Sequence, residues 1–174
     1  TTLIDNYTGE RIRISPLAFI TRAVVNALKE YPNFNSSIDT VNNKLIFKKY
    51  YHVGFAVDTQ HGLMVPKIRN VDQMGLKEIY EELRRVSKLC KELKIDKKEF
   101  FGGSMTISSL GSIGGSFFTP IINQPEVAIL GIGRAENKQV FIQDKYESRI
   151  MLPLSLSYDH RVIDGAEGAR FCVH

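Results

Sequence analysis

The chain has 174 residues, of which 43% are apolar and 24% charged, a composition that favours one globular domain with a sizeable core and argues against disorder. Its formal charge of +4 comes from 23 basic and 19 acidic residues that are interspersed, which argues against a nucleic-acid-binding patch. Two distant cysteines, no zinc-type Cys/His spacing, no apolar run of membrane-spanning length and no secretory leader favour a soluble protein in a reducing compartment.

Two helices are predicted from caps and apolar spacing. Ser15-Pro16 supplies an N-cap followed by a proline at the first helical position, apolar residues then recur every three or four positions, and Pro32 ends the helix. A second helix is predicted over about residues 75–94, where apolar residues again fall on one face. Residues 88–99 are densely charged but mix both signs, so we interpret them as a solvated surface.

Most of the remaining chain consists of short apolar runs bounded by turns or glycines, a pattern typical of strands. These runs cover residues 45–57, 63–68, 104–108, 117–118, 127–130, 140–142 and 150–157. Together with the helices they predict an α+β fold, a two-layer mixed β-sheet with helices packed on one side. We expect residues 1–174 to be a single domain truncated at both ends, because the chain begins with a polar segment and stops a few residues into a helix.

The segment 159–165, with the sequence DHRVIDG, connects the last predicted strand to a helix that begins at Asp164. Asp164 stands three positions before a glutamate, the spacing of a capping box. His160 lies in the connection itself, where catalytic side chains are often found. A lone histidine at such a turn more often satisfies a buried backbone group than it catalyses a reaction. We interpret Asp159 and Arg161 as positioning residues only.

Four familiar motifs are missing from the sequence. Gly131-Ile132-Gly133 begins like a dinucleotide-binding fingerprint but has no third glycine, and residues 111–115 lack the Gly-Lys-Ser/Thr ending of a P-loop. Neither a GxSxG elbow nor an HExxH pair occurs. Nucleotide-binding, serine-hydrolase and zinc-protease functions therefore have no motif to support them.

Three longer blocks resemble a known family. Residues 155–166, SLSYDHRVIDGA, resemble the C-terminal signature of the dihydrolipoamide acyltransferases, the E2 core components of 2-oxoacid dehydrogenase complexes. Residues 103–115, GSMTISSLGSIGG, together with TPIIN and PEVAILG downstream, are similar to the glycine-rich segment of that family. Residues 52–72, which contain HVGFAVDT, GLMVP and RNVD, resemble the pyruvate dehydrogenase branch. The similarity spans essentially the whole chain and implies the coenzyme-A-dependent, chloramphenicol-acetyltransferase-like fold.

The resemblance also implies a reaction, the transfer of an acetyl group between a dihydrolipoyl arm and coenzyme A, without a metal. It makes His160 the general base for the attacking thiol and Ser108 the hydroxyl donor to the tetrahedral oxyanion. Ser109 is the alternative to Ser108. Asp164 is implied to order the site, often through an arginine from the early part of the domain. The alternative, compatible with that role, is a helix cap worth about 1 kcal/mol.

The partners implied are further copies of the chain and the rest of the complex. Family members form homotrimers whose active sites lie between subunits, and these build cubic or dodecahedral cores that work with a lipoyl domain and the E1 and E3 components. No lipoyl or peripheral-subunit-binding domain is recognisable in the sequence. A non-catalytic trimer scaffold, or the same chemistry on succinyl or branched-chain acyl groups, are the alternatives. The expected location is the bacterial cytoplasm, or the mitochondrial matrix for a eukaryotic source.

Overall fold

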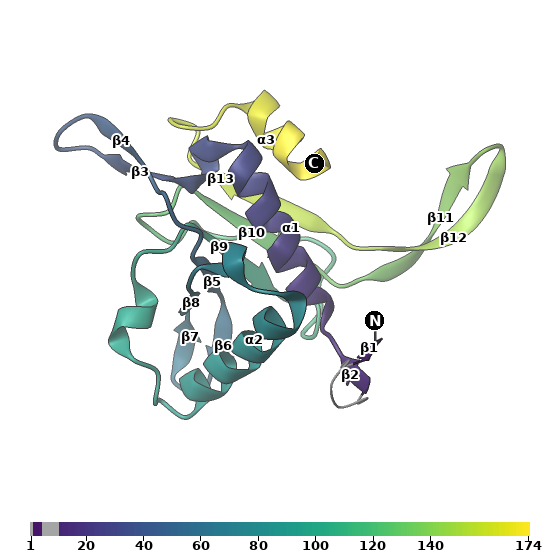
Figure 1. Cartoon of the computed structure of the whole chain (residues 1–174). Coiled ribbons are helices and arrows are strands. Elements are labelled where there is room, and N and C mark those ends of the chain that lie inside the picture. Colours follow the sequence, from purple (N-terminus) through teal and green to yellow (C-terminus); the bar gives the residue numbers. More distant parts are fainter. Residues whose placement is uncertain (1, 5–10) are drawn as a thin grey trace.

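The computed structural model describes residues 2–4 and 11–174 (Figure 1). The helices in this part of the chain are α1 (Pro16–Glu30), α2 (Leu76–Lys91) and α3 (Gly165–Val173), with the short 3-10 helices η1 (Pro32–Asn35), η2 (Val71–Gln73) and η3 (Lys97–Phe100). The strands are β1 (Thr2–Ile4), β2 (Arg11–Arg13), β3 (Ser36–Asp39), β4 (Lys44–Phe47), β5 (Val53–Phe55), β6 (Val57–Thr59), β7 (Gly62–Met64), β8 (Lys67–Ile68), β9 (Met105–Ser109), β10 (Ala128–Ile132), β11 (Glu136–Ile142), β12 (Lys145–Met151) and β13 (Leu154–Tyr158).

Five strands form the central sheet, in the order β13–β10–β9–β5–β8. β9 runs parallel to both of its neighbours, whereas the edge strands β13 and β8 run antiparallel to theirs. The other strands form two-stranded pairs, β1–β2, β3–β4, β6–β7 and β11–β12. The mixed sheet predicted from the sequence is therefore confirmed, with β9 at its centre.

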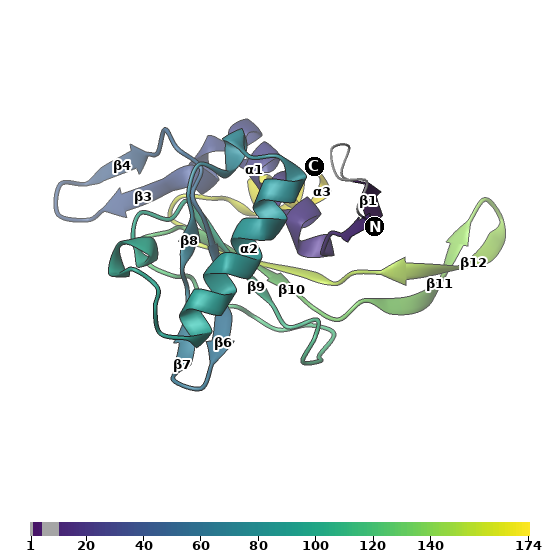
Figure 2. The ribbon, with the colours of Figure 1, turned by 60° about the horizontal axis from the view of Figure 1, so that its bottom comes forward.

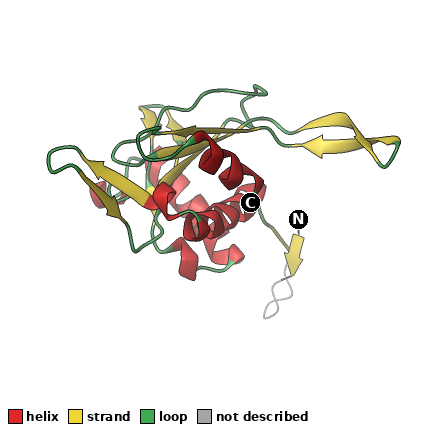
Figure 3. Cartoon of the chain, turned by 90° about the horizontal axis from the view of Figure 1, so that it is seen from above, coloured by secondary structure: helices red, strands yellow, loops and turns green. Residues whose placement is uncertain are grey.

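The three α-helices pack on one face of this sheet (Figures 2 and 3). Between the two layers lies one apolar core, in which Val25 and Leu28 of α1 and Ile79 of α2 are buried in the same cluster as Met105 and Ile107 of β9. The predicted two-layer α+β architecture is confirmed. None of the helices within the described residues is long and apolar enough to cross a membrane.

The predicted start and end of α1 are confirmed by its caps. Ser15 Oγ accepts a hydrogen bond from Leu17 N at 3.3 Å, and Pro16 occupies the first helical position, where its missing N–H costs nothing. At the other end Tyr31 N donates to Ala27 O at 2.8 Å, and the chain turns into η1.

The strands predicted over residues 45–57 and 63–68 are wrong as single elements. The first is divided among β4, β5 and β6, and the second between β7 and β8. Between β4 and β5 the chain crosses from a peripheral hairpin to the central sheet, and the buried Asn35 holds this crossing by donating to Lys48 O at 3.3 Å and Tyr50 O at 2.9 Å. Apolar spacing does not show where a chain leaves one sheet for another.

Three other boundaries differ from the prediction. The strand predicted over residues 150–157 covers the end of β12 and most of β13, with the buried Pro153 between them. The helix predicted to residue 94 ends at Lys91, because Leu93 adopts a φ of 54° and is 52% exposed. The run at residues 117–118 forms no strand, since it belongs to a loop that lies over Gly131 of β10.

Candidate active site

His160 lies in a tight turn between β13 and α3. Asp159 N still bonds to the segment before β10, at 2.8 Å, and Asp159 O accepts from Val162 N and Ile163 N at 3.0 and 3.1 Å. Ile163 is completely buried and anchors the turn to the core. The backbone around His160 is therefore fixed on both sides, while its imidazole is exposed and lies near the ring of Tyr158, with 5.6 Å between the ring centroids.

Asp159 and Arg161 pair with each other across this turn. The Arg161 guanidinium donates to Oδ1 of Asp159 at 2.9 Å and to Oδ2 at 2.6 Å, and Arg161 N donates to Oδ1 at 3.0 Å. These bonds hold the pKa of Asp159 below its ordinary value and raise the pKa of Arg161. An ion pair this exposed contributes little to global stability, but it restricts the conformation of the residue between its partners. The positioning role expected for both residues stays a prediction.

Asp164 is the N-cap of α3. Its Oδ1 accepts from Glu167 N at 2.7 Å, so the capping role that the sequence left open is present. The Glu167 carboxylate does not complete a capping box but accepts from Asn33 Nδ2 at 3.0 and 3.1 Å. The predicted capping box is therefore wrong in one of its two hydrogen bonds, the one from the Glu167 side chain back to the N-cap, because Glu167 instead links α3 to η1.

Aromatic contacts complete the attachment of α3 to the body. Phe171 stacks on Phe34 with 4.1 Å between the ring centroids and an interplanar angle of 20°. At Gly168 a Cβ atom would lie only 2.9 Å from the ring of Tyr158, so α3 approaches β13 more closely than a side chain there would allow. His160 and Asp164 are thus held in one rigid corner of the domain.

Ser108 and Ser109 lie at the end of β9, half-buried and exposed respectively. Successive side chains on a strand point to opposite faces of the sheet. Ile107 belongs to the core beneath the helices, so Ser109 shares the helix-covered face and Ser108, with Thr106, the opposite one. The two serines are therefore not interchangeable in a site on either face.

The strand register separates Ser108 from His160. Ser108 pairs in register with Gly131 of β10, and Gly131 pairs with Ser155 of β13. Ser108 and Ser155 are therefore two strand spacings of about 5 Å each apart across the sheet. Tyr158, the last residue of β13, lies a further 10 Å or so along the strand, and His160 lies beyond it. Within one chain, the structure brings His160 and Asp164 together but leaves Ser108 at the opposite end of the sheet.

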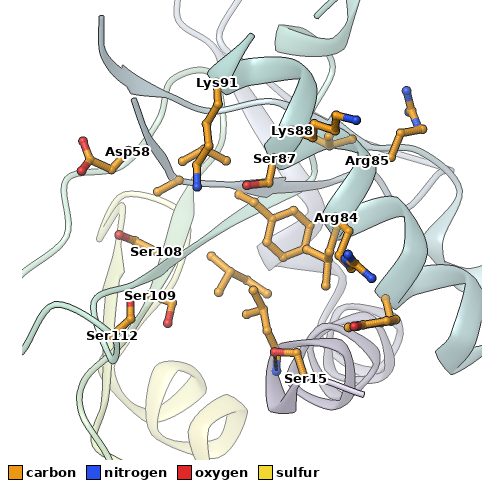
Figure 4. Close-up of a pocket in the computed structure, with 18 of the residues that line it drawn as sticks. Ser15, Asp58, Arg84, Arg85, Ser87, Lys88, Lys91, Ser108, Ser109 and Ser112 are labelled. Carbon is orange, nitrogen blue, oxygen red and sulfur yellow. Dashed lines mark hydrogen bonds between the residues drawn. The ribbon is translucent and has the colours of Figure 1, made fainter. Parts of the chain in front are cut away.

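A large groove opens between α2, β6 and the end of β9, and it reaches around that strand end, so that both Ser108 and Ser109 line it (Figure 4). Its volume is about 1050 Å³. Apolar side chains, among them Phe55 and Ile107, contribute to its lining, and Ser108, Ser109 and Ser112 line one side. Its dimensions suit a ligand with an apolar body and hydrogen-bonding groups at one end.

The basic side chains of this groove are functional candidates that the sequence interpretation missed. Arg84, Arg85, Lys88 and Lys91 all line it from α2. Arg85 pairs with Glu82 and Lys88 with a glutamate one turn on, whereas Lys91 extends from α2 toward the groove's centre (Figure 4). Helical spacing placed these residues on a polar face, but only the packing of α2 shows that this face borders a groove. Within the described residues, no group of three or more His, Cys, Asp or Glu could hold a metal ion.

Comparison with known proteins identifies the family. The sequence model of the 2-oxoacid dehydrogenases acyltransferase family (catalytic domain) matches residues 2–174. A curated relative from Cupriavidus necator, the dihydrolipoyllysine-residue acetyltransferase component of a pyruvate dehydrogenase complex, is 50% identical over 160 residues, which are 92% of this chain. The chain spans less than a third of that relative, 29% of its length.

Solved structures agree with the sequence match. A crystal structure of Azotobacter vinelandii dihydrolipoamide acetyltransferase, from a study of the catalytic roles of a serine, a histidine and an asparagine, has a TM-score of 0.90 and 49% identity, covering 93% of this chain and 67% of the other. The cubic core of a pyruvate dehydrogenase multienzyme complex matches with a TM-score of 0.90, 48% identity and the same coverages.

The predicted acyltransferase fold is confirmed as well. A chloramphenicol acetyltransferase shares it with a TM-score of 0.56 at 17% identity, covering 89% of this chain and 72% of the other. The family match and the two similar solved structures show that the chain belongs to the 2-oxoacid dehydrogenase acyltransferases, as a catalytic domain.

Proposed function

We propose that this domain transfers an acetyl group between a dihydrolipoyl arm and coenzyme A. The observation that carries the proposal is the position of His160, whose exposed imidazole stands on a rigid turn inside the family's signature segment. The named relatives are acetyltransferase components of pyruvate dehydrogenase complexes, which supports acetyl as the acyl group.

His160 acts as the general base. A thiol has a pKa of about 8.5 and is mostly protonated at neutral pH, whereas an imidazole with a pKa of about 6.5 is available to take its proton. The thiolate then attacks the thioester carbonyl, a tetrahedral oxyanion forms, and its collapse releases the other thiol, which recovers the proton from His160. No acyl-enzyme is needed, because the acceptor sulfur attacks directly.

Ser108 donates its hydroxyl hydrogen to the oxyanion. In the Azotobacter vinelandii enzyme, the serine and the histidine under study are separated by the same number of residues as Ser108 and His160. The histidine and the asparagine have the same separation as His160 and Asp164. This correspondence supports Ser108 over Ser109, and it places an asparagine where this chain has Asp164.

The active site is shared between two copies of the chain. Ser108 and His160 of one copy are too far apart to contact the same carbonyl, so Ser108 of one copy meets His160 of the next. A homotrimer provides three such sites. The matching cubic core supports assembly of trimers into a larger shell, and the lipoyl domain and the E1 and E3 components are the partners in the complex.

Coenzyme A occupies the groove beside Ser108. The apolar part of its lining suits the pantetheine arm, and Lys91 and its basic neighbours on α2 suit phosphate groups. The lipoyl arm then reaches the same carbonyl from the side of the second copy.

The test is acetyl transfer from acetyl-coenzyme A to free dihydrolipoamide, with the assembly state of each protein measured by light scattering. We expect His160→Ala to reduce kcat by about 10²–10⁴-fold and Ser108→Ala by about 10²–10³-fold, while Ser109→Ala serves as the matched control with little effect. An assembled wild-type protein without turnover would instead identify a structural scaffold. Greater activity with succinyl-coenzyme A or a branched-chain acyl-coenzyme A would show that the transferred group is one of these acyl groups instead of acetyl.

A further inference from the structure

A buried group of polar side chains lies on the face of the central sheet that carries Ser108. Thr106 of β9 points to that face, and its Oγ1 donates to Oε2 of Glu126 at 2.6 Å. Lys67 of β8 donates to Glu126 Oε1 at 2.5 Å and to Thr106 Oγ1 at 3.2 Å. We call Lys67, Thr106 and Glu126 the polar junction. All three side chains are buried, and each is bonded to the other two.

Two glycines make room for the polar junction. Gly54 of β5 pairs in register with Lys67 on one side and with Thr106 on the other, so the lysine side chain crosses over it. A Cβ at Gly54 would lie 2.5 Å from Thr106 Oγ1 and 2.6 Å from Lys67 Nζ. A Cβ at Gly103 would collide with Oε1 of Glu126. The backbone is therefore shaped to admit these side chains.

On one side, the polar junction holds the strand that carries Ser108. Thr106 lies two residues before Ser108 on the same face of β9, about 7 Å along the strand. A donor to an oxyanion contributes only when it is aimed at the developing charge, and a displacement of about 1 Å can cost about 10²-fold in rate. Bonds that fix β9 this close to Ser108 therefore bear on the reaction proposed for it.

On the other side, the polar junction leads to the turn that carries His160. Val127 follows Glu126 and is buried, and its carbonyl oxygen accepts a hydrogen bond from Asp159 N at 2.8 Å. Asp159 directly precedes His160. One peptide unit and one backbone hydrogen bond thus connect Glu126 to the residue before the proposed base.

We propose that Thr106 and Glu126 are positioning residues, which hold the Ser108 end of β9 and the His160 turn in a fixed relation. This inference rests on the proposed function, which gives Ser108 and His160 their roles. Hydrogen bonds are directional and fix a strand against small shifts, whereas apolar contacts are not directional. Because the site is proposed to form between copies, one polar junction positions a group in each of two neighbouring active sites.

The first test removes the Thr106 hydroxyl while nearly preserving the shape of the side chain. Thr106→Val does this, and Thr106→Ser retains the hydroxyl. Thr21→Val is the matched control, because Thr21 is also completely buried but donates to Leu17 O, at 2.7 Å, within α1. Acetyl transfer is measured with both substrates varied, at a temperature well below each unfolding midpoint, and assembly is measured by light scattering.

We expect Thr106→Val to lower kcat by about 10- to 100-fold while each KM changes by less than about twofold, because the substrates still bind but the reacting groups are misplaced. Thr106→Ser should keep at least about half of kcat, and Thr21→Val should lose stability but not kcat. If Thr106→Val does not fold, Asn123→Ala is measured by the same criteria, because Asn123 Nδ2 donates to Glu126 Oε1 at 3.3 Å from a half-buried position.

The second test locates the effect within the assembly. When His160→Ala and Ser108→Ala chains are coexpressed, a working site takes its serine from the first chain and its histidine from the second. Thr106→Val is added to one chain or to the other. We expect the restored activity to fall by about tenfold in either arrangement. A fall only when the serine-supplying chain carries Thr106→Val would reject the link to His160.

The positioning role is overturned if Thr106→Val has the kcat of the wild type, or if Thr106→Ser or Thr21→Val loses as much kcat as Thr106→Val. A wild type that assembles but transfers no acetyl group would reject the proposed function. Amide hydrogen exchange then tests the positioning role separately, as it does for a chain that remains monomeric. Faster exchange over residues 104–110 and 158–164 in Thr106→Val than in Thr106→Ser would leave the positioning role standing, whereas equal exchange would reject it.

Discussion

At the scale of single residues, Asp164 combines a demonstrated cap with a proposed role beside His160. Asparagine is as good an N-cap as aspartate, whereas alanine cannot accept the bond from Glu167 N. We predict that Asp164→Asn keeps both thermal stability and most of kcat, and that Asp164→Ala loses about 1 kcal/mol of stability together with activity. Thermal unfolding and steady-state kinetics on the same preparations measure both. Full activity in Asp164→Ala would show that Asp164 acts only as a helix cap.

His52 makes the stability of the domain depend on pH. Its Nδ1 accepts a hydrogen bond from Asn70 N at 3.1 Å, which requires the neutral ring, and burial, with a smaller effect of Arg69, lowers its pKa. The folded state therefore binds fewer protons than the unfolded state, whose histidine pKa is about 6.5. The stability from His52 is complete above that value and is lost as the pH falls from it toward the lower pKa of the folded state.

We predict that the unfolding temperature of the wild type decreases as the pH is lowered from about 7.5 to about 5.5. It should decrease less in His52→Gln, because the glutamine side chain can accept the hydrogen bond from Asn70 N without titrating. His61→Gln is the matched control, because His61 is exposed in the β6–β7 turn and should leave the pH dependence unchanged. Differential scanning fluorimetry across this range is sufficient. If the unfolding temperature depends on pH equally steeply in all three proteins, the acid sensitivity comes from other groups.

At the scale of secondary-structure elements, a buried ion pair links β8, β9 and the segment before β10. Lys67 pairs with Glu126, and both side chains are 1% exposed. Thr106 of β9 donates to Glu126 at 2.6 Å, on the face that also carries Ser108. Gly54 makes room for this group, because a Cβ there would lie 2.5 Å from Thr106 Oγ1. The pair thus fixes β9 two residues before Ser108.

Removing one partner leaves the other charge buried without compensation. We predict that Glu126→Gln lowers the free energy of unfolding by about 3–5 kcal/mol, and that Lys67→Met/Glu126→Gln recovers much of this loss. Urea denaturation followed by circular dichroism measures both. If the double variant is as unstable as the single one, the loss comes from the Thr106 contact rather than from the stranded lysine.

At the scale of the whole molecule, the separation of Ser108 from His160 in one chain supports the proposal that the active site forms between copies. We predict that His160→Ala and Ser108→Ala, each nearly inactive alone, regain about a quarter of the wild-type activity when they are coexpressed in equal amounts. One site in four then combines an intact histidine from one copy with an intact serine from the next. Activity no higher than that of either parent, in a mixture shown by mass spectrometry to contain mixed trimers, would place the whole site within one chain.

Much of the fold could be predicted from local signals, and the misses have common causes. The caps of α1 and α3 were readable because Ser15 and Asp164 act on backbone groups two or three residues away. The divided strands at residues 45–57 were not, since Asn35 holds that crossing from a distant position in the chain. Lys67 gave no sign of burial, because only its contact with Glu126, 59 residues away, makes a buried charge tolerable.

The sequence by itself determined the N-caps of α1 and α3, the α+β class, the family and the choice of His160 as the candidate base, because each depends on local spacing or on a contiguous signature. Only the tertiary structure decided that Ser108 and His160 lie at opposite ends of one sheet, that the basic side chains of α2 border a groove, and that the polar junction forms beneath Ser108's strand. The physical reason is strand register. Hydrogen bonds between distant segments set which residues are level with one another, and no local pattern encodes that pairing.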